Sequence, residues 1–234
     1  MKILSITTSS KVCGVAILEN TNIIKEINLD NGLTHSESLM PLINQVFEET
    51  NLSLSSIDLL VSDIGPGSFT GIRIGISTIK AFTDSLNIPS IGVNSLESLS
   101  FGSNLSGIVC SLIDAKKNNV YSGIFENIQD SNFSHIVRRS PSFENIDDLL
   151  LEIKNINPTY PICFVGDASI NHKDIILKYI PNAKFSDDNF LSASKVALAG
   201  FYNYKNQNFQ EVNPLYLRKS EAEKKMEEKL NESK

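Results

Sequence analysis

The sequence has no tryptophan, only three cysteines and three histidines, and no uninterrupted apolar run of the roughly 20 residues that would cross a membrane. Cys13, Cys110 and Cys163 lie far apart, each within an apolar stretch, as is typical of reduced thiols in a protein core. The first residues also show no signal-peptide pattern. Together these features predict a cytoplasmic protein without structural disulfides.

Basic residues are scarce relative to acidic ones. The 234 residues include 21 Lys and Arg against 27 Asp and Glu, which gives a formal net charge of −6. Phosphate binding requires a surplus of positive charge on one face, so this balance argues against a protein that binds nucleic acid by itself. The apolar content of 41 % is typical of a folded globular chain with room for one large or two small domains.

In the first hundred residues, runs rich in β-forming residues predict strands at 2–7, 12–18 and 22–28, a short apolar run with little alternation predicts a buried strand at 58–64, and a further short strand is expected at 89–93. A helix is expected from about residue 35, where Thr34 and Glu37 fit a capping box; a later start at Ser36 or Ser38 would place Pro41 in the tolerant first turn. A second helix follows Ser68, and Ser95 is a candidate cap for a third. The predicted apolar stripe of the second helix comprises Ile72, Ile76, Ile79, Phe82 or Thr83, and Leu86.

The second half of the chain repeats this plan. Strands are expected at 107–113, 120–125, 134–137 and 161–165, with helices at 146–153, 173–179 and 192–204. This order indicates a duplicated α/β unit of three strands, helix, strand and helix. The predicted domains are an N-terminal half at 1–103, a C-terminal half at 104–218, and a Lys/Glu-rich tail at 219–234 that is either a solvated helix or disordered.

A glycine-rich segment, residues 65–75, joins a predicted strand to a predicted helix. Free N–H groups at a helix N-terminus can bind an anion, but the spacing matches neither the dinucleotide fingerprint nor a P-loop. The alternative is a tight turn with Ser68 or Thr70 as the cap and with Gly71 and Gly75 permitting close packing. The sequence favours this packing interpretation.

The candidate chemical groups are sparse. His35 has no second histidine four residues away, and the cysteines fall in predicted strands, so neither a zinc site nor a thiol nucleophile is indicated. Asp114 and Asp167 follow strands, where α/β folds often place catalytic carboxylates. Thr7 stands at the corresponding place in the first half, so the pair of acidic loops is incomplete, and Asp114 could instead bind its own turn.

Several segments together resemble the TsaB family of bacteria, also called YeaZ. They are residues 3–10, 35–37 with 39–43, 65–75, 114–115 with 120–121, and 214–218. The glycine-rich segment is the most specific of these. The resemblance extends over most of the chain and implies the actin/hexokinase/Hsp70-like (ASKHA) fold, with two RNase H-like halves that each hold a mixed five-stranded sheet. The family's usual Asp in the first strand is Thr7 here.

The resemblance implies a cytosolic, non-catalytic subunit with no cofactor, metal or catalytic residue of its own. TsaB proteins pair with TsaD, the related catalytic subunit, and with the ATPase TsaE. The assembly forms N6-threonylcarbamoyladenosine next to the anticodon of tRNAs that read codons beginning with A. On this interpretation the chain meets tRNA only through the complex, and it is expected to form a homodimer when its partner is missing.

The family's partner surface is formed by two N-terminal helices, which correspond to residues 35–49 and 70–86 of this chain. Met40 and Phe47 add apolar character outside the main stripe of the first helix. Two helix faces can supply the about 800 Å² per partner that a specific interface buries. The residues predicted to bind a partner are His35, Leu39, Leu42, Ile43, Val46, Phe47, Gly71, Arg73, Ile74, Gly75, Thr78 and Phe82.

A second hypothesis is an independent enzyme of the same fold, either an ATP-dependent phosphotransferase or a metallopeptidase-like protein. It requires a nucleotide or metal site between the halves. Thr7 and the lack of a histidine pair count against it.

Overall fold

The first strand of the chain is buried on both faces. β1 (Lys2–Thr7) directs Ile3 to the side of the sheet covered by helix α7, while Leu4 and Ile6 point to the opposite side, where helices α1 and α2 lie. Side chains along a strand alternate between the two faces of a sheet, so a strand that is apolar on both requires a helical layer on each side. The computed structural model describes residues 1–30, 32–102, 106–129, 133–156 and 161–219.

The first sheet has the strand order β3-β2-β1-β4-β5. β1, β2 and β3 pair antiparallel, whereas β1, β4 and β5 run parallel. The elements are β1, β2 (Cys13–Glu19), β3 (Asn22–Leu29), α1 (His35–Thr50), the 3-10 turn η1 (Leu54–Ser56), β4 (Leu59–Asp63), α2 (Phe69–Leu86), β5 (Ser90–Val93) and α3 (Ser95–Ser100).

The second sheet repeats this arrangement in the order β8-β7-β6-β9-β10, with the same antiparallel and parallel pairings. Its elements are β6 (Gly107–Asp114), β7 (Asn119–Ile128), β8 (Ser134–Asn145), α4 (Ile146–Ile156), β9 (Cys163–Val165), α5 (Asp167–Asn171), α6 (Lys173–Tyr179), β10 (Lys184–Phe185) and α7 (Ala193–Lys205). The predicted fold class, a duplication of RNase H-like halves with a mixed five-stranded sheet in each, is therefore confirmed. The sequence did not predict α5 or β10, which are five and two residues long.

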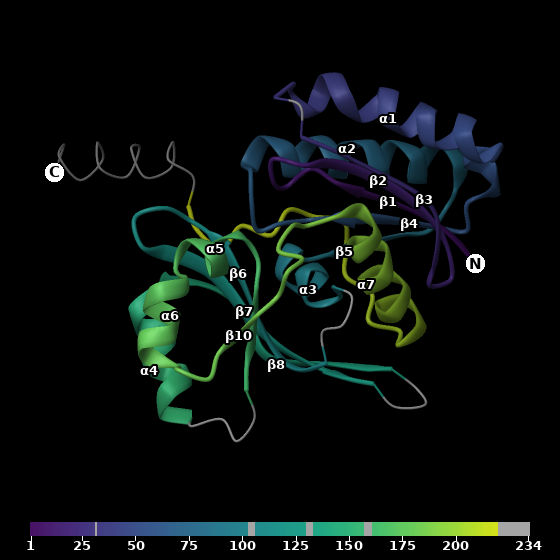
Figure 1. Cartoon of the computed structure of the whole chain (residues 1–234). Coiled ribbons are helices and arrows are strands. Elements are labelled where there is room, and N and C mark those ends of the chain that lie inside the picture. The colour runs from purple at the N-terminus through teal and green to yellow at the C-terminus, as the bar shows by residue number, and fades with distance from the viewer. Residues whose placement is uncertain (31, 103–105, 130–132, 157–160, 220–234) are drawn as a thin grey trace, which may run out of the picture.

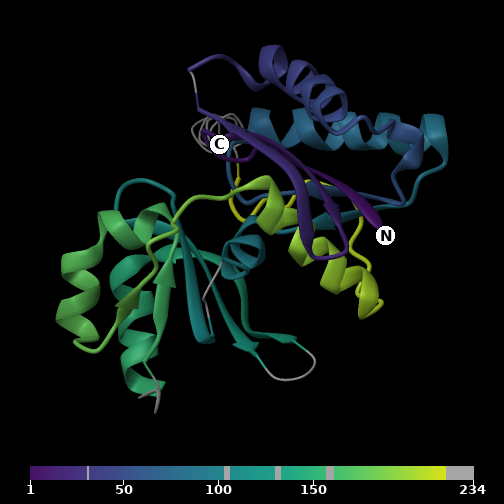
Figure 2. The same ribbon diagram turned by 45° about the vertical axis from the view of Figure 1, so that its right-hand side comes forward.

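The helices form layers around the two sheets. α1 and α2 lie side by side over the outer face of the first sheet, and α7 covers its inner face (Figure 1). α4 and α6 cover the outer face of the second sheet and appear at the far left after rotation (Figure 2). The α1–α2 layer is thus on the outside of the molecule.

Each half contributes one helix to the core of the other half, and α3 and α7 are called the exchanged helices below. α7 follows the second sheet in the chain but packs on the first, where Val196 joins the cluster around Val61. α3 follows the first sheet but packs Leu96 against Tyr121 and Phe125 of the second. The two exchanged helices also contact each other between the sheets. Each apolar core is therefore completed by a helix from the other half of the chain.

Helix α1 begins at His35, so the earlier of the two predicted starts is the observed one. Thr34 donates its backbone N–H to the Glu37 carboxylate at 3.1 Å, as a capping box requires. Pro41 consequently lies inside the helix and not in its first turn. Its ring is on the exposed side, where water can satisfy the Glu37 carbonyl that loses its helical partner.

Two further local expectations were wrong. The cap of α3 is Asn94, whose side chain accepts from the Glu97 N–H at 2.7 Å, while the hydroxyl of Ser95 is used elsewhere. Leu86 belongs to the predicted apolar stripe of α2 but is 41 % exposed, because it is the last residue of the helix.

The predicted tail lies outside the described residues beyond Lys219, and the predicted limits at 1–103 and 104–218 stay predictions. In the described part of the chain, every helix is too short or too polar to cross a bilayer.

A buried polar cluster lies where the two exchanged helices meet the second sheet. The Glu97 carboxylate of α3 accepts from Asn203 of α7 at 2.9 Å and from Asn94 at 3.0 Å. Nδ1 of His135, on β8, lies 2.7 Å from the side-chain amide oxygen of Asn127, so Nδ1 carries the proton and donates it. Its Nε2 lies 3.9 Å from the Glu97 carboxylate and has no hydrogen-bond partner among the described residues.

Burial affects the two titrating groups of this cluster in opposite directions. It raises the pKa of Glu97 from 4.5 to about 7 and lowers the pKa of His135 from 6.5 to about 4. Folded Glu97 holds a proton that the unfolded chain has lost, so its contribution to stability falls as pH rises from 4.5 to 7. Folded His135 lacks a proton that the unfolded chain binds, so its contribution rises with pH from 4 to 6.5. The two slopes oppose each other.

We therefore expect a variant that lacks one of these two residues to show the pH dependence of stability that the other residue contributes. Glu97→Gln should make the free energy of unfolding rise between pH 4 and 6.5, by roughly 3 kcal/mol. His135→Gln should make it fall between pH 4.5 and 7 by a similar amount. Urea denaturation across this pH range measures both, with the unaltered chain as the reference. If the free energy of unfolding changed with pH in the same direction in both variants, the opposite pKa shifts of Glu97 and His135 would be contradicted.

Candidate functional site

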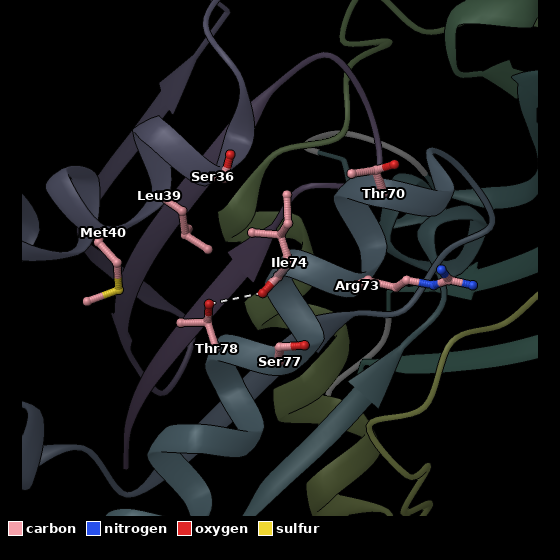
Figure 3. A pocket seen from close by; sticks show the side chains of 8 residues that line it. All are labelled: Ser36, Leu39, Met40, Thr70, Arg73, Ile74, Ser77 and Thr78. Atoms are coloured by element: carbon pink, nitrogen blue, oxygen red, sulfur yellow. Dashed lines mark hydrogen bonds between the residues drawn. The ribbon is translucent and has the colours of Figure 1, made fainter.

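A groove of about 450 Å³ lies between α1 and α2 on the outer face of the molecule (Figure 3). It is lined by Ser36, Leu39, Met40, Thr70, Arg73, Ile74, Ser77 and Thr78. The lining combines apolar side chains with hydroxyl groups and includes a single charged residue, Arg73. These groups suit the side chains of another helix, since they offer burial for apolar groups but no cluster of acids, bases or nucleophiles.

Helix α1 buries one stripe against the sheet and leaves a second apolar side uncovered. Leu39, Leu42, Ile43 and Val46 are buried in the cluster that includes β1. Met40 points away from this stripe toward the groove opening and is 46 % exposed (Figure 3). An exposed Met beside an apolar groove is a typical feature of adaptable binding surfaces, because its unbranched side chain can fit different shapes.

Helix α2 supplies the other wall. Ser68 caps it, accepting from the Gly71 N–H at 3.2 Å, and Ile72, Ile76 and Ile79 face the sheet. Ile74 lies on the side toward α1, near Leu39 (Figure 3). The Thr78 hydroxyl bonds to the Ile74 carbonyl at 2.9 Å, so the helix satisfies this polar group itself. The α2 wall of the groove therefore presents one apolar side chain, Ile74, among hydroxyl groups and Arg73.

The turn between β1 and β2, residues 7–10, fixes both helices. Thr8 donates its hydroxyl to the Gly71 carbonyl at 2.7 Å, and the Ser9 carbonyl accepts from the Ser68 N–H at 2.7 Å. His35, the first residue of α1, donates Nε2–H to the Ser10 carbonyl at 2.8 Å. His35 is half-buried and therefore connects α1 to the turn.

The glycines of residues 65–75 allow α2 to approach this turn. A Cβ atom at Gly67 would lie 2.2 Å from the Ser9 carbonyl oxygen, and one at Gly71 would lie 1.9 Å from the Thr8 carbonyl oxygen. Neither distance can hold a carbon atom. The packing interpretation of the glycine-rich segment is the one that the structure supports, because the N–H of Ser68 is already bonded to the turn.

Asp63, at the end of β4, is the buried acid beside the same turn, and sequence reasoning missed it. Its carboxylate accepts from the hydroxyls of Thr7 at 2.9 Å and Ser95 at 2.6 Å, from Ser9, and from the Gly65 N–H at 3.0 Å. Burial raises the pKa of Asp63, while the four donors oppose that shift. With these donors in place, the carboxylate binds parts of its own chain together.

The other candidate acids are also engaged. Asp114 accepts from the N–H of Lys116 at 2.8 Å in a local turn and forms an ion pair with the same lysine, while Asp167 accepts from the N–H of Asp114 at 2.9 Å. The two strand-end acids thus lie together, as their places in the repeat suggest. Among the residues described, no group of three or more His, Cys, Asp and Glu is placed to hold a metal ion. Burial raises the pKa of Cys13 to about 11, so this thiol is unreactive.

The residues predicted to bind a partner fall into three groups. Leu39, Arg73, Ile74 and Thr78 line the groove. Leu42, Ile43, Val46, Phe47 and Phe82 belong to the apolar cluster between the helices and the sheet. His35, Gly71 and Gly75 lie against the turn at residues 7–10, and Gly71 also adjoins the His35 ring. Contact of these residues with a partner stays a prediction.

Four groove residues, Ser36, Met40, Thr70 and Ser77, were not among those predicted to bind a partner. Met40 carried a signal, an apolar residue off the main stripe of an amphipathic helix. Small hydroxyl residues on a helix surface carry none, because their position relative to a second helix depends on the tertiary fold.

Comparison with known proteins gives a consistent result. Residues 32–226 match the family model described as TsaD, tRNA N6-adenosine threonylcarbamoyltransferase. The chain is 33 % identical over 127 residues to the tRNA threonylcarbamoyladenosine biosynthesis protein TsaB of Bacillus subtilis, a match covering 54 % of this chain and 56 % of that protein. It is 32 % identical over 124 residues to the TsaB of Escherichia coli, covering 52 % and 53 %. The chain thus spans about half the length of the curated relatives it matches.

Solved structures agree on the fold. YeaZ from Pseudomonas aeruginosa superimposes with a TM-score of 0.72 at 20 % identity, over 92 % of this chain and 100 % of that chain. A protein described as similar to peptidase YeaZ, also from Pseudomonas aeruginosa, gives 0.74 at 21 % identity, over 93 % and 99 %. Both likenesses extend across the two halves.

The contact between α2 and the turn generates a stability prediction. Gly71→Ala should lower the free energy of unfolding by about 2–3 kcal/mol, because the new methyl group meets a backbone carbonyl that cannot rotate away. Ser77→Ala, on the exposed side of the same helix, should change it by less than about 0.5 kcal/mol. Urea denaturation measures both variants. Equal free energies of unfolding for the two variants would show that the turn moves to accommodate the new methyl group.

Proposed function

The chain belongs to the family described as TsaD, tRNA N6-adenosine threonylcarbamoyltransferase, and within it to the TsaB/YeaZ proteins, and on this premise we propose that it is a non-catalytic subunit. In this proposal the chain binds and stabilises a TsaD-like catalytic subunit that forms N6-threonylcarbamoyladenosine next to the anticodon of tRNAs reading codons that begin with A. The chain itself makes and breaks no bond.

The observation that supports this most directly is the α1–α2 groove. It lies on the outer layer, it combines Leu39, Met40 and Ile74 with small hydroxyl residues, and its walls are held in place by the turn behind them. A partner with the same fold would offer a matching pair of helices, and four helices packed in this way form a bundle. The predicted partner residues that line the groove, Arg73 and Thr78 among them, are then contact residues.

We also propose that the remaining partners follow from this arrangement. A TsaE-like ATPase would join the pair, and tRNA would contact the chain only within the assembly, in keeping with a net charge of −6. Without its partner the chain would form a homodimer through the same groove, since an uncovered apolar surface favours self-association.

The alternative, an independent phosphotransferase or metallopeptidase-like enzyme, receives no support from the acids of the structure. Asp63 is surrounded by four donors of its own chain, Asp114 accepts from the Lys116 N–H in the turn that follows it, and Asp167 accepts from the Asp114 N–H.

Reconstitution tests the proposal as a whole. Purified TsaD-like and TsaE-like subunits with tRNA, ATP, threonine and the enzyme that makes the threonylcarbamoyl-adenylate should modify tRNA only when this chain is added. Nucleoside analysis by mass spectrometry is the measurement. Full modification without the chain would overturn the proposal.

A pair of matched variants tests the surface. Met40→Glu should raise the Kd for the TsaD-like subunit at least about 30-fold, because a carboxylate would be buried in an apolar groove without a partner. Leu151→Glu is the control: Leu151 lies on α4 of the second half and is 45 % exposed, against 46 % for Met40. Calorimetry gives both constants. Similar losses for the two variants would place the interface elsewhere.

A further inference from the structure

Arg73 is the one charged residue in the groove lining, and its guanidinium lies on the rim of α2 that faces away from α1 (Figure 3). The chain as a whole is acidic, so an exposed cation at this position stands out against the surrounding charge. A partner that fills the groove and extends across α2 would meet this guanidinium at the edge of the interface.

The guanidinium is held in one orientation by Tyr216. Arg73 Nε donates to the Tyr216 hydroxyl at 2.8 Å, and its central carbon lies 5.7 Å from the centre of the Tyr216 ring. That ring in turn stacks on Phe69, with ring centres 4.6 Å apart and planes at 19°. An arginine fixed through Nε loses less side-chain entropy when its terminal groups bind a ligand.

The two terminal amino groups of Arg73 have no hydrogen-bond or ion-pair partner within the described part of the chain. They form a planar fork with two parallel N–H directions, which matches the two oxygens of a carboxylate. The orientation set by Tyr216 leaves this fork available at the rim.

Tyr216 is itself positioned from both halves of the molecule. It belongs to a strap, residues 209–218, that crosses the edge of the first sheet: Leu215 donates its N–H to the Ile64 carbonyl at 2.8 Å. Two residues after Tyr216, Arg218 donates to the Ala115 carbonyl of the second half at 3.3 Å and lies over the ring of Tyr121. The strap is therefore anchored on either side of Tyr216.

We propose that Arg73, oriented by Tyr216, binds a carboxylate of the partner protein in the α1–α2 groove. The face then selects a helix with apolar residues for the groove and an acidic residue beside them, with Tyr216 as a positioning residue. This inference rests on the proposed function. A protein carboxylate is favoured over an RNA phosphate because the groove is also lined by Leu39, Met40 and Ile74, which require an apolar ligand.

Lys80 provides a matched control. It is a cation on the same helix and it also bonds to the strap, donating to the Asn213 side chain at 2.8 Å, but it does not line the groove. Substitution of Lys80 therefore removes the same charge and a comparable strap contact without touching the proposed site.

The test measures association with the TsaD-like subunit by surface plasmon resonance at low salt, about 50 mM, and at high salt, about 500 mM. Arg73→Gln should raise Kd about fivefold at low salt and by less at high salt. A charge at the rim of an interface attracts the partner and forms an exposed ion pair, and salt weakens both effects. Tyr216→Phe keeps the ring stack but loses the acceptor, and should raise Kd about twofold. Lys80→Gln should leave it unchanged. Thermal denaturation confirms that all variants are folded.

Each outcome has a separate meaning. Absence of binding by the unaltered chain would overturn the proposed function. Binding by the unaltered chain with no loss for Arg73→Gln, or an equal loss for Lys80→Gln, would overturn this inference and leave the function in place. Two further results would also overturn it: weaker tRNA binding by the assembled complex with unchanged subunit affinity, or weaker self-association alone.

Discussion

The outer helices take their positions from one buried carboxylate and the hydroxyl-rich turn that bonds to it. Asp63 is bound by Thr7 and Ser9 of the turn, by the loop before α2, and by Ser95 at the start of α3. The turn then bonds to the first residues of α1 and α2. A buried acid is costly unless donors surround it, so this cluster fixes its neighbours as a unit. The groove exists because both of its walls are attached to the same turn.

Thr7 is well matched to this cluster. A carboxylate at this position would face Asp63 as a second negative charge in a buried setting, and the pair would have to share a proton. The threonine hydroxyl instead donates to Asp63 at 2.9 Å. Thr7 therefore adds a hydrogen-bond donor to the cluster that supports α1 and α2.

The duplication was predictable because strands such as β1 and β6 carry apolar runs of the right length, and because their order repeats. The positions of groove residues were predictable only in part. Periodicity separates the sheet-facing stripe of α1, with Leu42 and Val46, from the rest of the helix, but it gives no distance between the outer sides of two helices. Asp63 and Tyr216 were missed because their partners are remote in sequence: Tyr216 is 143 residues from Arg73. Pro41 was misleading because tertiary packing outweighs a local propensity.

The exchanged helices have a mechanical consequence. In a molecule of two lobes, each with its own complete core, the lobes can rotate relative to each other about a hinge. Here α7 packs against the first sheet and α3 packs against the second, and the two helices contact each other. Each helix moves with the sheet that it covers, so any movement of one half relative to the other must act on the contact between α3 and α7. The packing of these two helices therefore determines how the halves are placed relative to each other.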